Sequence, residues 1–79
     1  IDLQRIPALP IMAWLAQAGG ISEAEMLKTF NCGIGMILAV EPTQVATVEA
    51  ALSTQGMSSV RLGEVISGQG VSYMGQLPF

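Results

Sequence analysis

Histidine is absent from this sequence of 79 residues. Its absence removes the commonest general base and transition-metal ligand, together with any serine–histidine or cysteine–histidine nucleophile pair. Basic residues are scarce as well: Arg5, Lys28 and Arg61 are scattered along the chain, and the net charge is −3. Because phosphate neutralisation needs a cluster of basic side chains, the sequence argues against nucleic acid as a partner.

The sequence also contains a single cysteine and no apolar run long enough to span a membrane. Cys32 is the only cysteine, so neither an internal disulfide nor a thiolate zinc cage can form, and a reducing, cytoplasmic location is expected. No apolar run approaches the ~20 residues that a membrane span needs, and no signal peptide is recognisable. We therefore expect no membrane partner. The first residue is Ile1 rather than methionine, which suggests a piece of a longer protein.

Charged residues make up only 11% of the chain, whereas hydrophobic residues make up 51%. An ordinary soluble domain has about 25% charged residues. The length is sufficient for one small domain, and a domain of about 60 residues buries only about 60% of the surface of its unfolded chain. Part of the apolar surface is therefore expected to face a partner, either another domain or another copy of the chain.

Two helices are predicted in the first half of the sequence. The first covers roughly 10–18, because Pro10 suits the opening helical position, apolar residues recur at helical spacing, and Gly20 belongs to a glycine pair that ends it. The second covers about 23–30. It begins at Ser22, which has a glutamate three residues later and so forms a capping box.

The second half is predicted to form a small sheet around one helix. The segment Ile34–Val40 is apolar at nearly every position, as in a strand buried on both faces. A helix is expected over 43–55, followed by a second strand at Val60–Ser67 that pairs as a hairpin with a short strand at Val71–Met74. The lead-in 1–9 is expected to be extended.

The expected element order is helix, helix, strand, helix, strand, strand. This order corresponds to an α/β (α+β) fold in which two N-terminal helices precede a β-α-β-β unit. The crossover between the first two strands is expected to be right-handed, which places the intervening helix on one face of the sheet.

The candidate site is the turn between the second helix and the first expected strand. There Gly33 and Gly35 alternate with apolar residues, and glycines let the backbone approach either a ligand or a neighbouring element closely. They are not a dinucleotide fingerprint, because no strand precedes them and no third glycine opens a helix. The Asn31 amide is able to fix a polar ligand, cap the preceding helix, or form an Asx turn.

No catalytic or metal-binding group is expected among these residues. Cys32 lacks a histidine partner and follows the C-terminal end of a helix, which raises a thiol pKa, so it is interpreted as a small buried hydrophobe. The carboxylates show no spacing typical of a metal site: Asp2, Glu23, Glu25, Glu41, Glu49 and Glu64.

The segment Thr29–Met36 resembles the C-terminal domain of the phosphoribosylformylglycinamidine cyclo-ligase family, the aminoimidazole ribonucleotide synthetases of purine biosynthesis. Further similar blocks occur in the same order: Pro7–Ile11, Gly19–Met26, Gly63–Val65 and Gly68–Val71. One departure is Cys32, where many members carry methionine. The resemblance implies that 1–79 is the C-terminal portion of a larger α/β C-terminal domain, without the N-terminal domain that binds ATP and forms the dimer.

The resemblance also implies a function. The parent would be an ATP-dependent cyclo-ligase that converts formylglycinamidine ribonucleotide to aminoimidazole ribonucleotide, with ATP and Mg²⁺ bound mainly by the N-terminal domain. The partners implied are that N-terminal domain, a second subunit in a homodimer, and the small ribonucleotide substrate. Asn31, Gly33 and Gly35 would line the substrate or nucleotide cleft, and the chain alone is expected to be inactive.

Three other interpretations remain open. The first is another enzyme of the same ATP-binding superfamily, such as formylglycinamidine synthetase, selenophosphate synthetase or thiamine-monophosphate kinase. The second is a free-standing β-α-β-β module that binds a small ligand or a partner strand. The third is a structural dimerisation element, which the excess of apolar residues allows.

Overall fold

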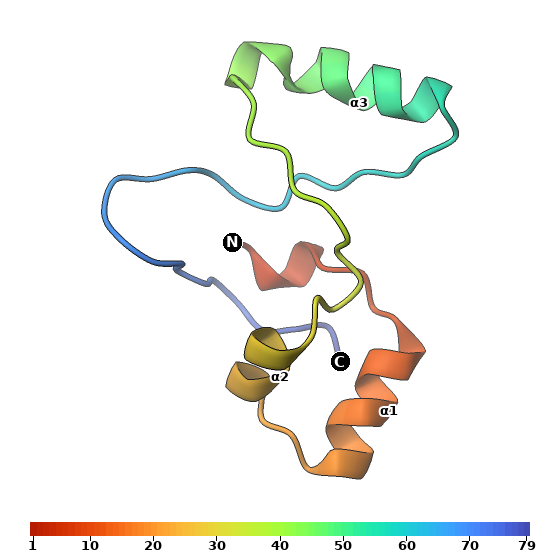
Figure 1. The fold of residues 1–79 in the computed structure, drawn as a ribbon, viewed down its shortest axis with the longest axis vertical. Coiled ribbons are helices and arrows are strands. Elements are labelled where there is room, and N and C mark those ends of the chain that lie inside the picture. The colour runs from red at the N-terminus through yellow and green to blue at the C-terminus, as the bar shows by residue number, and fades with distance from the viewer.

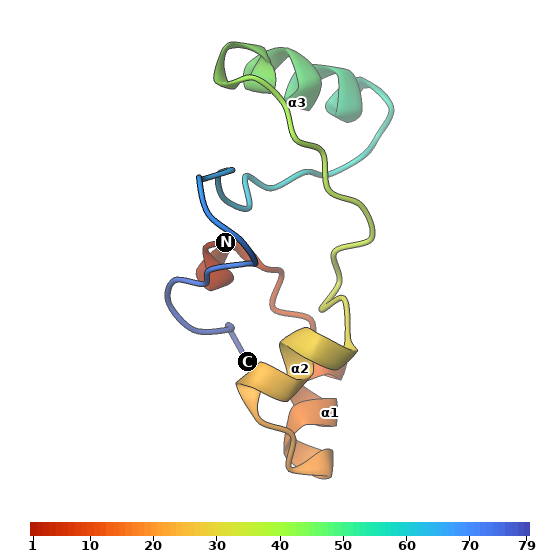
Figure 2. The same ribbon diagram turned by 60° about the vertical axis from the view of Figure 1, so that its left-hand side comes forward.

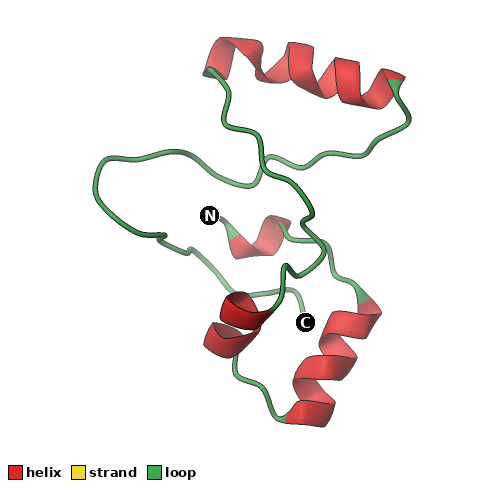
Figure 3. Cartoon of the chain, viewed as in Figure 1, coloured by secondary structure: helices red, strands yellow, loops and turns green.

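The fold is built from helices and extended segments, as a computed structural model describing residues 1–79 shows (Figure 1). Two short 3-10 turns accompany the helices and no strand is present (Figure 3). The helices are α1 (Pro10–Gly19), α2 (Glu23–Thr29) and α3 (Val45–Thr54), and the 3-10 turns are η1 (Leu3–Arg5) and η2 (Pro42–Gln44). No helix has the length and apolar character needed to cross a membrane.

The first two helices confirm the sequence prediction, because their ends are set by local chemistry. Pro10 opens α1, and Gly20 ends it in the left-handed conformation at φ 59°, where a residue without Cβ meets little strain. At the start of α2, the Ser22 hydroxyl accepts a hydrogen bond of 3.3 Å from the backbone N–H of Glu25. The extended backbone of Phe30 ends α2 after Thr29, one residue earlier than predicted.

Helix α3 lies apart from the other helices, at the far end of two extended segments (Figures 1 and 2). Its predicted range of 43–55 is close to the observed one, although the chain enters through η2 before the α-helix begins at Val45. An exposed ion pair of 2.6 Å joins Glu49 of α3 to Arg61 in the segment that follows. This pair closes the loop through which α3 returns toward the rest of the chain.

The predicted α/β fold with a β-α-β-β unit is wrong. No strand forms in the three segments predicted to be strands, which are Ile34–Val40, Val60–Ser67 and Val71–Met74. The one β-bridge is an isolated parallel pair of Asp2 with Met74. A strand exists only when its backbone groups pair with a neighbouring strand. None of the N–H groups from Gly35 to Val40 donates to another backbone group, so apolar character alone did not produce a sheet.

The expected hairpin fails because the N-terminus occupies the position between its two arms. The Asp2 N–H donates to the Leu62 carbonyl at 2.9 Å, and the Leu3 N–H donates to the Met74 carbonyl at 2.9 Å. Met74 in turn donates to the carbonyl of Ile1 at 2.8 Å. The lead-in is therefore not simply extended as predicted, because it enters these bonds and then turns through η1.

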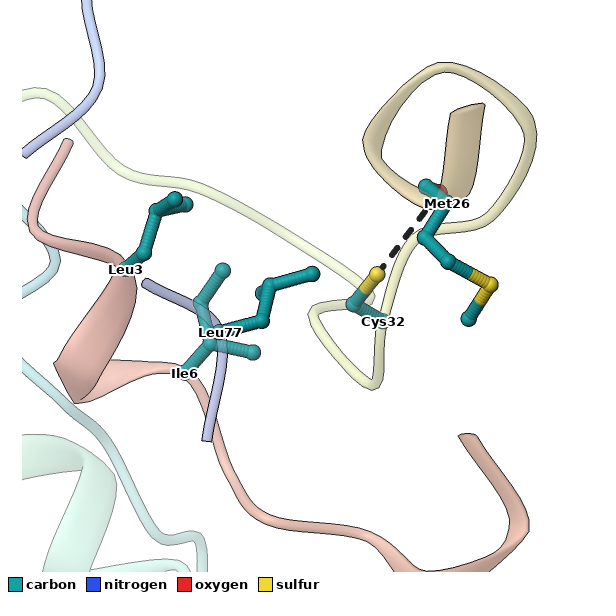
Figure 4. Close-up of a cluster of buried hydrophobic side chains, with 5 residues drawn as sticks. All are labelled: Leu3, Ile6, Met26, Cys32 and Leu77. Atoms are coloured by element: carbon teal, nitrogen blue, oxygen red, sulfur yellow. Dashed lines mark hydrogen bonds between the residues drawn. The ribbon is translucent and has the colours of Figure 1, made fainter. Parts of the chain in front are cut away.

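The hydrophobic core is small. Five of the 79 residues are buried, and they come from η1 and the residue after it, from α2, from the turn that follows α2, and from the C-terminal tail (Figure 4). They are Leu3, Ile6, Met26, Cys32 and Leu77. The radius of gyration is 14.1 Å, against about 12 Å for a compact domain of this length. The chain is thus much more open than a closed globular domain.

Candidate functional site

The turn after α2 is fixed by hydrogen bonds within itself. The Asn31 side-chain oxygen Oδ1 accepts a hydrogen bond of 2.9 Å from the Gly33 N–H. The Asn31 carbonyl accepts another of 3.0 Å from the Ile34 N–H. This is the Asx turn, one of the roles that the sequence left open for Asn31. The side-chain nitrogen Nδ2 of Asn31 makes no hydrogen bond within the chain, and the residue is exposed.

The two glycines of the turn differ in backbone conformation and in surroundings. Gly33 has φ 93°, a backbone conformation that favours glycine, and a Cβ added there would lie 2.6 Å from Cδ1 at the end of the Leu9 side chain. Gly35 has no atom within 4 Å of the position of an added Cβ. Its backbone N–H makes no bond to another backbone group. Backbone conformation therefore explains Gly33, whereas Gly35 presents an open backbone.

Cys32 confirms the interpretation as a buried apolar residue. It is 1% exposed, and its Sγ donates weak hydrogen bonds to the carbonyls of Met26 and Phe30, each at 3.8 Å (Figure 4 shows the first). Burial raises the pKa of the Cys32 thiol, because a thiolate is poorly solvated there. Its backbone is left-handed with φ 53°, a conformation uncommon outside glycine.

Cys32 is expected to resist thiol-specific reagents at neutral pH in the native protein and to react fully in denaturant. The raised pKa and the burial both lower the population of accessible thiolate. Because the folded-state pKa lies above the unfolded one, the stability that the thiol contributes is present below pH about 8.5 and is lost as the pH rises further. Rates of modification by iodoacetamide, followed by mass spectrometry with and without urea, measure this; equal rates would contradict it.

Asn31 and Cys32 lie at a shallow hollow of about 250 Å³. The other lining residues are almost all apolar: Ile1, Ile6, Leu27, Phe30, Ile34, Ile37, Leu62 and Tyr73. Gly33 and Gly35 are not among them, so the structure brings only one of the three predicted cleft residues to this hollow. Ligand pockets span about 300–1,000 Å³, and this hollow is smaller than that range.

A second hollow, of about 520 Å³, shares Leu27 and Tyr73 with the first and is lined by residues of η1, α2 and the C-terminal segment. Lys28 and Glu23 supply opposite charges there, beside Tyr73. The Glu23 carboxylate accepts a hydrogen bond of 2.9 Å from the backbone N–H of Leu77. Sequence reasoning missed this hollow, because Glu23 and Leu77 are 54 positions apart and no local signal connects them.

The carboxylates are not gathered together, and only those of Asp2, Glu23 and Glu49 accept hydrogen bonds within the chain. Asp2 pairs with Arg5 at 3.3 Å, and Glu49 pairs with Arg61. Hydrogen bonding by the Arg61 guanidinium holds the pKa of the Glu49 carboxyl below its usual value. No group of three or more histidine, cysteine, aspartate or glutamate residues is placed to hold a metal ion. These residues do not fit a Mg²⁺ site, which needs several oxygen ligands in near-octahedral geometry.

Comparison with known families gives one match to nearly the whole chain. Residues 1–76 match the family model described as "AIR synthase related protein, C-terminal domain". The matched region includes all three helices, the turn after α2 and both hollows. No solved structure matches the chain.

Proposed function

We propose that this chain, which belongs to the AIR synthase related proteins as their C-terminal domain, lines the reaction cleft of a phosphoribosylformylglycinamidine cyclo-ligase. The observation that carries the proposal is the family match over residues 1–76. The motif Thr29–Met36, which lies inside that region, favours the cyclo-ligase within the wider family. The enzyme would close the imidazole ring of aminoimidazole ribonucleotide from formylglycinamidine ribonucleotide with consumption of ATP.

The turn after α2 supplies the groups that face the cleft in this proposal. Asn31 has a free Nδ2 donor, and Gly35 has an uncovered backbone N–H. Amide donors of this kind suit the oxygens of a phosphate or a ribose. Gly33 positions them through its bond to Asn31 and its packing on Leu9. Asn31 and Gly35 would thus bind substrate, whereas Gly33 would hold the shape of the turn.

The remaining parts of the proposed enzyme lie outside these residues. ATP and Mg²⁺ would be held mainly by the N-terminal domain of the parent, because the carboxylates here do not fit a metal site. That domain would complete the cleft, since the hollow beside Asn31 is too small alone to enclose a nucleotide. The parent is proposed to act as a cytoplasmic homodimer.

The test is an activity assay on the parent protein and on this chain alone. We expect the parent to form aminoimidazole ribonucleotide from formylglycinamidine ribonucleotide and ATP, and the isolated chain to turn over no ATP. Selenide, thiamine monophosphate, and formylglycinamide ribonucleotide with glutamine serve as competing substrates. Preferential turnover of any of these by the parent would assign it to another branch of the family, and ATP turnover by the isolated chain would contradict the division of labour proposed here.

A further inference from the structure

The hollow lined by η1, α2 and the C-terminal segment has the size of a small-molecule site. Its volume of about 520 Å³ falls within the range of about 300–1,000 Å³ that is usual for ligand pockets. Helix α2 and the C-terminal segment lie side by side (Figures 1 and 2), and the hydrogen bond from the Leu77 N–H to the Glu23 carboxylate joins them. The hollow is therefore fixed by a contact between distant parts of the chain.

The two charged side chains that line this hollow, Glu23 and Lys28, are not paired with each other. Neither of them belongs to an ion pair of the chain. Oε2 of Glu23 accepts the bond from the Leu77 N–H, whereas Oε1 makes no hydrogen bond within the chain. The Lys28 ammonium makes none either. One acceptor and one cation are thus available to a ligand that carries both charges.

The rest of the wall is mostly apolar. Leu3, Ala24 and Leu27 line it, and Leu3 is buried. Tyr73 adds an aromatic ring and a hydroxyl group that makes no hydrogen bond within the chain, and Gly75 adds a backbone N–H that donates to no other group. An apolar wall with a few polar groups is the usual composition of a ligand site.

The charges of this hollow favour a zwitterion over a phosphate or a nucleotide. Lys28 is the only cationic side chain that lines it, and the Glu23 carboxylate would repel a ligand with several negative charges. The hollow beside Asn31 has no charged side chain in its wall. A ligand with one positive charge, one negative charge and an apolar body therefore matches this hollow and not the other one.

From these observations we infer that the hollow binds an amino acid with an apolar side chain. The Lys28 ammonium, the Tyr73 hydroxyl and the Gly75 N–H are the donors for its carboxylate, and Oε1 of Glu23 accepts from its ammonium group. The apolar side chain of the ligand packs on Leu3 and Leu27. The inference does not depend on the proposed function.

Titration of the unmodified chain with three matched compounds tests this inference. L-Phenylalanine carries both charges, 3-phenylpropionate lacks the ammonium group, and 2-phenylethylamine lacks the carboxylate. We expect L-phenylalanine to bind with a Kd on the order of millimolar, as for a weak small-ligand site, and to shift the amide NMR signals of Lys28, Tyr73 and Gly75. The two singly charged compounds are expected to bind about three- to tenfold more weakly, because each leaves one charge of the hollow unmatched.

Three outcomes of this titration would overturn the inference. The first is equal or tighter binding of either singly charged compound. The second is the absence of saturable shifts at concentrations well above millimolar. The third is a set of shifts confined to the hollow beside Asn31.

Glu23→Gln and Lys28→Gln each remove one charge from the hollow and assign it to one end of the ligand. Each variant is expected to weaken L-phenylalanine binding about three- to tenfold, since contacts of exposed charges are partly screened by water. Glu23→Gln should bind L-phenylalanine and 3-phenylpropionate equally. Lys28→Gln should bind L-phenylalanine and 2-phenylethylamine equally. Glutamine at position 23 keeps an oxygen that accepts from the Leu77 N–H.

Glu25→Gln is the matched control. Glu25 also lies in the first turn of α2, so its neutralisation removes a similar interaction with the helix dipole, but it does not line the hollow. We expect Glu25→Gln to bind L-phenylalanine as the unmodified chain does, with far-UV circular dichroism showing unchanged helix in all three variants. Equal weakening by Glu25→Gln, or unchanged binding in both Glu23→Gln and Lys28→Gln, would overturn the assignment of this hollow.

Discussion

Met26→Ala is expected to lower the free energy of unfolding by about 2–5 kcal/mol, the usual cost of removing a large buried side chain. Met26 is 1% exposed and belongs to a core of only five residues. Its backbone carbonyl also accepts the weak hydrogen bond from Cys32. A domain of this length has about 4–12 kcal/mol of stability in total, so one substitution removes a large share. Urea titration followed by far-UV circular dichroism measures the loss.

Met36→Ala is the matched control for this change. It removes the same atoms from a side chain that is 82% exposed, where little packing is lost, and substitutions at such surface positions usually change stability by less than about 0.5 kcal/mol. Equal losses for the two variants would show that the cluster around Met26 does not hold the fold together.

Asn31→Ala is expected to lower turnover of the parent enzyme about tenfold or more, equivalent to about 1.4 kcal/mol or more of transition-state stabilisation. The substitution removes the acceptor that bonds to the Gly33 N–H as well as the free Nδ2 donor. Loss of the turn bond alone costs about 0.5–1.5 kcal/mol of stability. We therefore expect a large fall in rate beside a small fall in melting temperature, measured on the same preparations.

Asn31→Asp separates the two roles of this side chain. Aspartate keeps an oxygen that accepts from the Gly33 N–H and can form the same Asx turn, but it has no amide donor and adds a negative charge. The melting temperature should stay near that of the unmodified enzyme, whereas turnover should still fall, because an anionic substrate would be repelled. Full activity in Asn31→Asp would restrict Asn31 to shaping the turn and would remove it from the cleft.

The helices were predictable because the groups that begin and end them are close in sequence. Pro10 and Gly20 define α1 through backbone conformation alone, and Ser22 caps α2 through a bond to a residue three positions away. Such interactions form within one helical turn and need no partner from elsewhere. Short stretches of the sequence are therefore sufficient to predict where α1 and α2 begin and end.

The sheet was predicted wrongly because strand pairing is decided over long distances. The apolar run Ile34–Val40 has the composition of a buried strand, but composition does not name the segment that pairs with it. The bonds from Ile1–Leu3 to Leu62 and Met74 connect residues about 60 to 70 positions apart. The periodicity of the sequence does not indicate that the N-terminus lies between Val60–Ser67 and Val71–Met74, the two segments expected to form a hairpin.

The candidate site, too, has features that were predictable from the sequence and features that were not. The Asx turn of Asn31 spans two residues and was among the predicted roles, and the burial of Cys32 followed from the absence of any chemical partner. The different surroundings of Gly33 and Gly35 were hidden, because only the fold shows that Leu9 lies against Gly33. The bond between Glu23 and Leu77 was equally hidden, since it joins residues 54 positions apart.

The isolated position of α3 separates the stability of this helix from that of the core around Met26. No residue of α3 is fully buried, and its side-chain link to the returning segment is the exposed pair of Glu49 with Arg61. Exposed ion pairs contribute little to stability, so α3 can open and close as a separate cooperative unit while the core around Met26 stays intact. Amide protons in α3 should accordingly exchange with solvent sooner than those of α2, and proteases should cut first in the arms that carry α3.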